Sequence, residues 1–196
     1  MRATTLRVKA LCADDIEEAT KLASDCMAQS DYYAGIYPSA TAAEKTASVC
    51  ARLRPTLRYC IETGGAFGLR NAAGELDAYE YMADYGTLKS NAPKLYAHIF
   101  DAAAGVPAFY ELQTALDALL AQGRRVTYIM GFGIAQRARR SPSVLMAMAR
   151  FNLALLQEKE IIAADFTNKD LLSICALHGP FEIKKLAENY WMLVTR

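Results

Sequence analysis

The feature that most constrains the fold of this chain is a strand, a basic turn and a long apolar helix that follow one another without a break. The strand, VTYIMGFGI (126–134), lacks the alternation of a sheet with one wet face, which is typical of an interior strand. Ser141 is a good N-cap and Pro142 suits the first helical position, so a helix is predicted from there to about Lys159. Because nearly every face of this helix is apolar, it must pack within a layered core.

The rest of the chain alternates between strand and helix signals. Residues 6–11 alternate apolar and basic side chains as a half-buried strand does, and Asp14 with Glu17 predicts a capping box for the next helix. Further strands are expected over 66–70, 76–82, 161–166, 181–185 and 189–195, and further helices from Ala42, with an interruption near Pro55, and over 93–103 and 107–120. This order predicts an α/β fold in which a mixed sheet has helices on both faces.

Composition narrows the classes of function. With 196 residues, of which 53% are hydrophobic, the chain is expected to form one domain over 1–196. A net charge of +1 argues against nucleic-acid and membrane-surface partners, so any anion site must be local. Five scattered cysteines without a C-x-x-C pair indicate reduced thiols in the cytoplasm, and two isolated histidines predict no metal site. Neither a signal peptide nor a membrane span is expected.

The turn before the apolar helix is a candidate anion site. Arg137, Arg139 and Arg140 precede the helix, and Ser141 and Ser143 add two hydroxyl groups. Arginines at a helix N-terminus oppose its dipole, an arrangement that costs less when an anion is bound there. Arginine side chains also make charge-assisted contacts with phosphate. A solvated basic turn is the alternative interpretation.

The element order and several local motifs resemble the GNAT superfamily of acyl-CoA-dependent N-acyltransferases. YIMGFGI (128–134) is similar to the strand that pairs with the pantetheine arm, RRSPSV (139–144) fills the pyrophosphate-binding turn, and NKDLLSICALHGPF (168–181) resembles the motif with a cofactor-contacting asparagine. The ending NYWMLVTR is similar to that of one acetyltransferase branch. The resemblance implies one GNAT-like acyltransferase domain, with a mixed central sheet of six to seven strands flanked by helices on both faces.

The resemblance also implies which residues hold the cofactor, acetyl-CoA or another acyl-CoA. They are Gly133, Ile134, Arg139, Arg140, Ser141, Ser143, Val144 and Asn168. The family's two turn glycines are absent. Their places fall on Pro142 and Val144 when the turn starts at Arg139, or on Ser141 and Ser143 when it starts at Ala138, and Pro142 also removes an N–H donor. Arginine and serine side chains are expected to replace part of the backbone contact. For Asn168, plain N-capping is the alternative.

Three residues are candidates for catalysis by the same resemblance. Glu80 is expected on the apolar face of its strand with Leu76, Ala78 and Met82, opposite Asp77, Tyr79 and Tyr81. A buried acid there would suit the deprotonation of an amine, with a salt bridge or a shifted register as the alternatives. Cys175 stands where the family has its general-acid tyrosine, and buried packing is its alternative. Tyr128 is expected to line the pocket, together with Tyr79 and Tyr81, and an ordinary place in a strand is the alternative for all three.

The resemblance therefore implies direct transfer of an acyl group from acyl-CoA to an amine on a small molecule or peptide. The oxyanion would be polarised by a backbone N–H near Gly133. Two alternatives stay open: a GNAT-fold binding or regulatory protein without catalysis, and an N-acyltransferase whose donor is an acyl carrier protein. A homodimer is possible by analogy with the family.

Overall fold

A computed structural model of the chain describes residues 6–27, 41–100, 107–169, 172–173 and 180–195. Its strands are β1 (Val8–Ala10), β2 (Ala66–Arg70), β3 (Leu76–Asp84), β4 (Val126–Ile134), β5 (Ile161–Phe166), β6 (Phe181–Ala187) and β7 (Tyr190–Thr195). Its helices are α1 (Ile16–Met27), α3 (Ala42–Glu62), α4 (Tyr85–Asn91), α5 (Pro93–Phe100), α6 (Pro107–Leu120) and α7 (Pro142–Glu158), with 3-10 turns η1 (Ala13–Asp15) and η3 (Gln136–Ala138).

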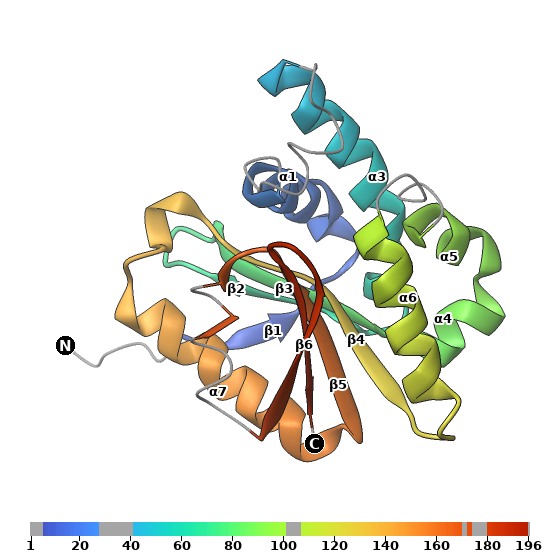
Figure 1. Cartoon of the computed structure of the whole chain (residues 1–196). Helices are drawn as coiled ribbons and strands as arrows, with labels where there is room; N and C mark the ends of the chain where they lie inside the picture. Colours follow the sequence, from blue (N-terminus) through green and yellow to red (C-terminus); the bar gives the residue numbers. More distant parts are fainter. Residues whose placement is uncertain (1–5, 28–40, 101–106, 170–171, 174–179, 196) are drawn as a thin grey trace.

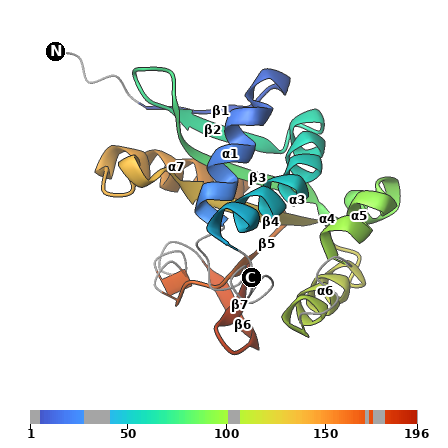
Figure 2. The ribbon, with the colours of Figure 1, turned by 90° about the horizontal axis from the view of Figure 1, so that it is seen from above.

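The strands form one mixed sheet of seven, in the order β1-β2-β3-β4-β5-β7-β6. Adjacent strands are antiparallel except β4 and β5, which α7 connects as a parallel pair. The predicted α/β fold, with a mixed sheet between helices, is confirmed. In Figure 1 and, from above, Figure 2, α7 lies on one side of the sheet, and α1, α3 and the α4–α6 group lie on the other.

The two faces of the sheet bury separate clusters of apolar side chains. Beneath α7, Val144 and Met148 pack on Ala78, and Leu155 packs on Met82. On the opposite face α3 packs against Tyr79 and Tyr81, and α4 to α6 surround the beginnings of β4 and β5. The unbroken apolar pattern of the two parallel strands follows from this burial on both faces.

Two helical expectations are corrected. Pro55 was expected to interrupt its helix, but α3 continues through it, with Leu53 and Leu57 buried on either side of the proline. The extra helix α4 begins directly where β3 ends, because the Asp84 side chain accepts the N–H of Thr87 at 2.7 Å and acts as N-cap.

Two expectations near the beginnings of elements are also corrected. The capping box at the start of α1 is not formed by Asp14 and Glu17; instead the Asp15 side chain accepts the N–H of Cys12 at 2.7 Å, in the η1 turn. Leu76 does not share a face with Ala78, because a register shift in the β2–β3 ladder turns it toward the α3 side. Within the described residues, no helix is long and apolar enough to cross a bilayer.

Candidate functional site

The candidate site is the place where the two parallel strands part. β4 and β5 pair from Val126–Ile161 to Ile129–Ala164, where the ladder ends. β4 continues along β3 as far as Ile134, whereas β5 continues along β7 as far as Phe166. The sheet is therefore split in its middle, and no strand among the described residues lies opposite the peptide groups that line the split.

The register of β4 against β3 decides which peptide groups face this gap. The β3–β4 ladder has a bulge at Met130, and the N–H of Ala135 donates to the carbonyl oxygen of Asp77 at 2.8 Å. Because antiparallel peptide groups alternate in direction, Gly133 bonds toward β3 while Phe132 and Ile134 face the gap. Of the two predicted pantetheine partners, Ile134 is turned toward the gap and Gly133 is not.

The glycines of β4 are explained by packing against tyrosines. The rings of Tyr79 and Tyr81 are stacked 6.0 Å apart and lie across Gly133 and Gly131. A Cβ at Gly131 would lie 2.3 Å from Cε1 of Tyr81, and one at Gly133 would lie 2.5 Å from Cε1 of Tyr79. The two tyrosines, predicted as pocket liners, are core residues of the α3 side.

The three arginines of the basic turn have different surroundings. Arg137 donates to the buried Asp77 carboxylate at 2.8 Å and to the Leu76 carbonyl oxygen at 3.0 Å, so it is held by the hairpin. Arg139 donates through Nε to the Ile134 carbonyl oxygen at 3.3 Å, which keeps its side chain beside the gap. Arg140 is exposed and forms no ion pair with any described residue. Arg139 and Arg140 are therefore the arginines of the turn left for an anion.

The first turn of α7 faces the same region. Ser141 is the N-cap by backbone geometry, and its Oγ lies 2.9 Å from that of Ser143 rather than on a backbone N–H. Pro142 has no N–H, but the amides of Ser143 and Val144 lie in the first helical turn, where no helical carbonyl reaches them. Two amides and two hydroxyl groups thus remain for an anion, while the Val144 side chain is buried.

A carboxylate that the sequence analysis missed lies at the vertex of the gap. Asp165 of β5 is one residue beyond the last β4 pair, and it accepts hydrogen bonds from the hydroxyl groups of Tyr128 at 2.6 Å and Tyr190 at 2.7 Å. Burial raises the pKa of Asp165, although both hydroxyl groups act in the opposite direction. The acid in the otherwise apolar strand IIAADF was the signal that could have identified it.

Glu80 lies elsewhere, beneath α7. Only 1% of its surface is exposed, neither carboxyl oxygen has a hydrogen-bond partner among the described residues, and burial raises its pKa to about 8. The amide of Asn152 on α7 acts in the opposite direction on that pKa. Tyr128 belongs to the cluster on the other face, so the structure does not bring Glu80 and Tyr128 together.

Two further predicted residues lie in the segment after β5. Asn168 is exposed, and its carbonyl oxygen accepts the N–H of Leu172 at 3.0 Å, as expected at the start of a helical turn. Cys175 lies outside the described residues, so its predicted role as general acid stays a prediction.

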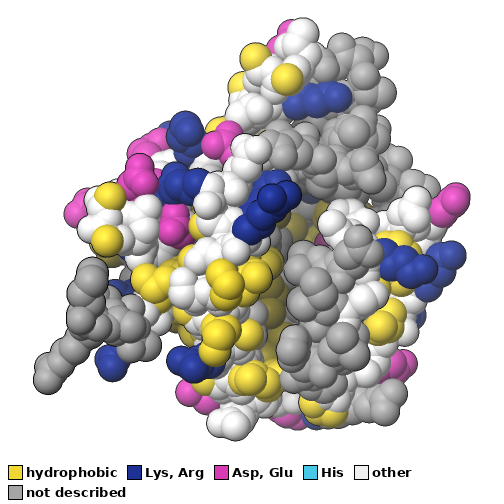
Figure 3. Space-filling model, turned by 90° about the vertical axis from the view of Figure 1, so that its left-hand side faces the viewer, with side chains coloured by type: hydrophobic (Ala, Val, Ile, Leu, Met, Phe, Trp, Pro, Cys, Tyr) yellow, Lys and Arg dark blue, Asp and Glu magenta, His cyan; other side chains and the backbone are white. Residues whose placement is uncertain are grey.

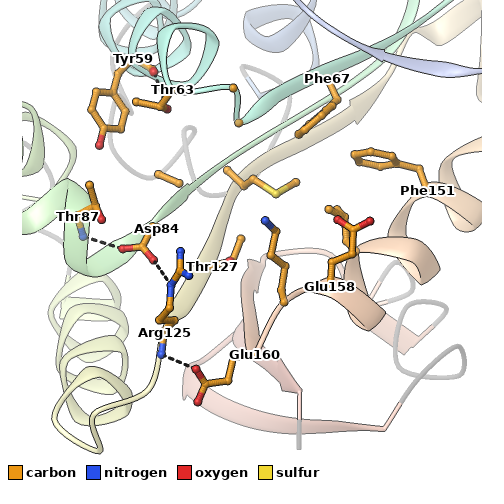
Figure 4. Close-up of a pocket in the computed structure, with 16 residues that line it drawn as sticks. Tyr59, Thr63, Phe67, Asp84, Thr87, Arg125, Thr127, Phe151, Glu158 and Glu160 are labelled. Atoms are coloured by element: carbon orange, nitrogen blue, oxygen red, sulfur yellow. Dashed lines mark hydrogen bonds and ion pairs between the residues drawn. The ribbon is translucent and has the colours of Figure 1, made fainter.

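A separate groove of about 560 Å³ opens at the other end of the sheet, where β3 ends and β4 begins (Figure 4). Asp84 lies 3.7 Å from Arg125, whose backbone N–H donates to Glu160 at 3.1 Å, so these three residues of the groove bind one another. None of the predicted site residues lines it. Among the described residues no group of three acidic, cysteine or histidine side chains could hold a metal ion.

No family model and no curated protein matches the sequence. Solved structures do match along nearly the whole chain. Arylalkylamine N-acetyltransferase 2 from Aedes aegypti has a TM-score of 0.67 at 11% identity and covers 98% of this chain and 99% of its own. Polyamine N-acetyltransferase from Drosophila melanogaster has a TM-score of 0.63 at 12% identity, with 97% and 99% covered.

A third match was solved with coenzyme A bound. It is the PaiA N-acetyltransferase from Thermoplasma acidophilum, with a TM-score of 0.56 at 8% identity and 98% and 99% of the two chains covered. Identities this low carry the fold and leave the activity to be tested. With its seven-stranded mixed sheet and its split between β4 and β5, this chain has the fold of the GNAT superfamily.

Proposed function

We propose that the protein is an N-acyltransferase that moves an acyl group, first of all acetyl, from coenzyme A to an amine. The observation that carries the proposal is the gap between β4 and β5, with a basic helix N-terminus at its mouth and the Asp165 carboxylate at its vertex. Acetyltransferases of the same fold, one of them solved with coenzyme A, support the class of reaction.

The donor would lie along β4 in the place of the missing strand. Its pantetheine amides would bond to the peptide groups of Phe132 and Ile134, which face the gap. Its pyrophosphate would be held at the start of α7 by Arg139 and Arg140, by the hydroxyl groups of Ser141 and Ser143, and by the Val144 amide. Asn168, beyond β5, would contact the donor from the other side.

The transfer would proceed by direct attack. Asp165 takes a proton from the acceptor ammonium, and the free amine nitrogen then forms a bond with the thioester carbonyl carbon. The carbon–sulfur bond breaks as the carbonyl reforms, and the nitrogen gives its second proton to solvent. The thiolate leaves and takes a proton from solvent or, as the resemblance implies, from Cys175. Gap-facing N–H groups of β4 would stabilise the oxyanion. Tyr128 and Tyr190 orient the carboxylate of Asp165.

Asp165 suits the role of base better than Glu80 does. Its carboxylate lies where the donor's thioester would end, and its raised pKa brings it toward the range in which a base accepts protons at neutral pH. Glu80 is covered by α7 and lies on the opposite face from the tyrosines of the vertex. The role that the sequence predicts for Glu80 therefore competes with that of Asp165, and their variants separate the two.

Calorimetric titration with acetyl-CoA is the first test. We expect micromolar binding that Arg139→Ala with Arg140→Ala weakens at least tenfold, about 1.4 kcal/mol. Arg58→Ala is the matched control, because Arg58 is an exposed arginine on α3, across the sheet. Wild-type protein that binds no acetyl-CoA would contradict the proposed donor.

Turnover is measured as free thiol released from acetyl-CoA with a panel of amines. Thiol release that depends on the amine, with the acetylated amine identified by mass, supports transfer. Tight acetyl-CoA binding without transfer to any amine would favour a binding or regulatory protein of the same fold, for which the missing turn glycines and the Cys175 substitution are the motivation.

A further inference from the structure

We infer that the outer face of α7 is a docking surface for an acidic acyl carrier protein, which delivers its acyl group on a phosphopantetheine arm into the gap between β4 and β5. The inference rests on the proposed acyl transfer and names a partner for the same site. The surface consists of Leu145, Met146, Ala149, Arg150 and Leu153, and we call it the α7 surface.

The α7 surface is apolar where a solvated helix face would be polar. Leu145, Met146 and Leu153 have exposed fractions of 48%, 54% and 45%, and they are three of the five large hydrophobic side chains exposed among the described residues. Leu145, Ala149 and Leu153 recur at intervals of four, so they form one stripe along the helix. Hydrophobic side chains gather over this side of the molecule in Figure 3, with basic side chains at the edges of the patch. Such a patch is typical of an interaction site.

The charge along the stripe is positive up to its last turn, and the first acid on α7 is Glu158. Residues 118–157 contain six arginines and not one acidic residue or lysine, in a chain whose net charge is only +1. Arg124, Arg125 and Arg137 are paired with acids from outside this stretch. Arg140 and Arg150 are exposed and form no ion pair among the described residues. A partner that fits the α7 surface is therefore acidic and presents apolar side chains between its acids.

A second copy of this chain fits the α7 surface poorly. In a two-fold dimer the same surface would meet itself, so Arg150 in the middle of the stripe would approach the Arg150 of the other copy. No acidic side chain on α7 before Glu158 could neutralise them. A different, acidic protein satisfies both the apolar stripe and the arginines.

The position of the surface connects it to the donor's path. The stripe begins in the first turns of α7, directly beside the basic turn and the mouth of the gap. A phosphopantetheine arm carries one phosphodiester in place of the charged pyrophosphate of coenzyme A. It therefore needs fewer hydrogen-bond donors from a turn in which Pro142 has no backbone N–H. Contacts of the carrier protein along α7 would supply the rest of the affinity.

The test uses purified acyl carrier protein loaded with acetyl or octanoyl groups, beside acetyl-CoA and octanoyl-CoA. The variants are Arg150→Glu and Met146→Glu, with Arg58→Glu on α3 as the matched charge reversal away from the surface. We expect each α7 variant to raise the KM for the loaded carrier at least tenfold and to leave kcat/KM for acyl-CoA within twofold. Binding of the wild type should weaken as NaCl rises, since exposed charges are screened. Thermal unfolding checks that each variant is folded.

Each other outcome overturns part of the idea. Wild-type protein that uses acyl-CoA and neither binds nor uses the loaded carrier would overturn the docking surface and leave the proposed acyltransferase intact. An equal rise in the KM for the loaded carrier in Arg58→Glu would mean a nonspecific charge effect and would also overturn the docking surface. A wild-type dimer that Met146→Glu dissociates, or binding to vesicles of anionic lipid with none to the carrier, would assign the surface to a second copy or to a membrane. Carrier binding that the α7 variants abolish, without transfer from any donor, would support the surface and contradict the acyltransferase.

Discussion

Glu80 and Asp165, two carboxyl groups of this sheet whose pKa is raised by burial, lie on opposite faces and differ in their neighbours. Glu80 faces α7, where neither oxygen has a hydrogen-bond partner among the described residues, and its pKa rises to about 8. Asp165 accepts hydrogen bonds from two tyrosine hydroxyl groups at the point where β4 and β5 part. A buried carboxyl group without hydrogen-bond donors favours its protonated form, whereas donors stabilise the charged carboxylate that a general base needs. Burial alone therefore does not identify the catalytic carboxylate.

The largest expected effect is on stability and tests whether Glu80 is held protonated in the folded protein. The folded protein keeps the Glu80 proton up to about pH 8, whereas the unfolded chain loses it near pH 4.5. The free energy of unfolding should fall as pH rises through this window, by roughly 3 to 5 kcal/mol in total. Glu80→Gln should remove the fall, so that the variant is the more stable protein at pH 9 and similar to wild type at pH 4.5. Urea titrations at several pH values measure this, with the exposed Glu62→Gln as control.

The next effect is on activity and tests whether Asp165, and not Glu80, is the general base. Asp165→Asn should lower kcat/KM about a hundredfold or more, because the amide cannot accept the ammonium proton. In the wild type, activity should rise with pH through the raised pKa of Asp165, and the variant should lose this limb of the profile. If Glu80→Gln lost more activity than Asp165→Asn, with both folded, the base would be Glu80.

A smaller effect concerns the tyrosines that cover β4. Gly131→Ala should lower the free energy of unfolding by about 2 kcal/mol, since its Cβ would occupy the position of the Tyr81 ring. Gly86→Ala is the control, because its Cβ would meet the end of the Leu120 side chain at 3.1 Å and Oδ1 of Asp84 at an ordinary contact distance of 3.6 Å. Equal stability of the two variants, measured by chemical unfolding, would show that the Tyr81 ring can move aside and that the glycine serves something else.

The smallest effect separates the arginines of the basic turn. Arg137→Ala should cost about 1 kcal/mol of stability, because the buried Asp77 would keep only the long hydrogen bond from Asn71 among the described residues, and the loss is moderated because Arg137 is half exposed. Its affinity for acetyl-CoA should stay near that of the wild type. Should calorimetry instead give a loss as large as that of Arg140→Ala, Arg137 would belong to the anion site.

The fold could be predicted from the sequence wherever the signals are local. Ser141 and Pro142 mark the beginning of α7 within two residues, and the apolar run of β4 indicates an interior strand. The expectation that α7 is buried on nearly every face was wrong, because Leu145, Met146 and Leu153 are exposed. The face of the sheet on which Leu76 lies was predicted wrongly, because the register shift depends on how β2 pairs with β3, which no single segment specifies. The helix α4 was missed although its cap, Asp84, was visible, because the residue also ends a strand.

The site was less predictable, because it is assembled from segments far apart in the chain. The basic turn is a local motif, and its arginines could be named, but which of them pairs with Asp77 depends on the hairpin 60 residues away. Tyr128, Asp165 and Tyr190 come from three strands, and only the order β4-β5-β7 makes them neighbours. The burial of Glu80 was predicted from its strand, whereas the absence of a hydrogen-bond partner among the described residues depends on α7, which covers it.

The split in the sheet has a mechanical consequence. In the described part of the chain, four residue pairs of backbone ladder, from Val126–Ile161 to Ile129–Ala164, join the β1–β4 half of the sheet to the β5–β7–β6 half. A ligand that bonds to the gap-facing peptides of β4 would behave as an inserted strand and continue this short seam. Amide hydrogen exchange across β5 and β7 should slow on donor binding, because the added hydrogen bonds would make local separation of the two halves of the sheet rarer.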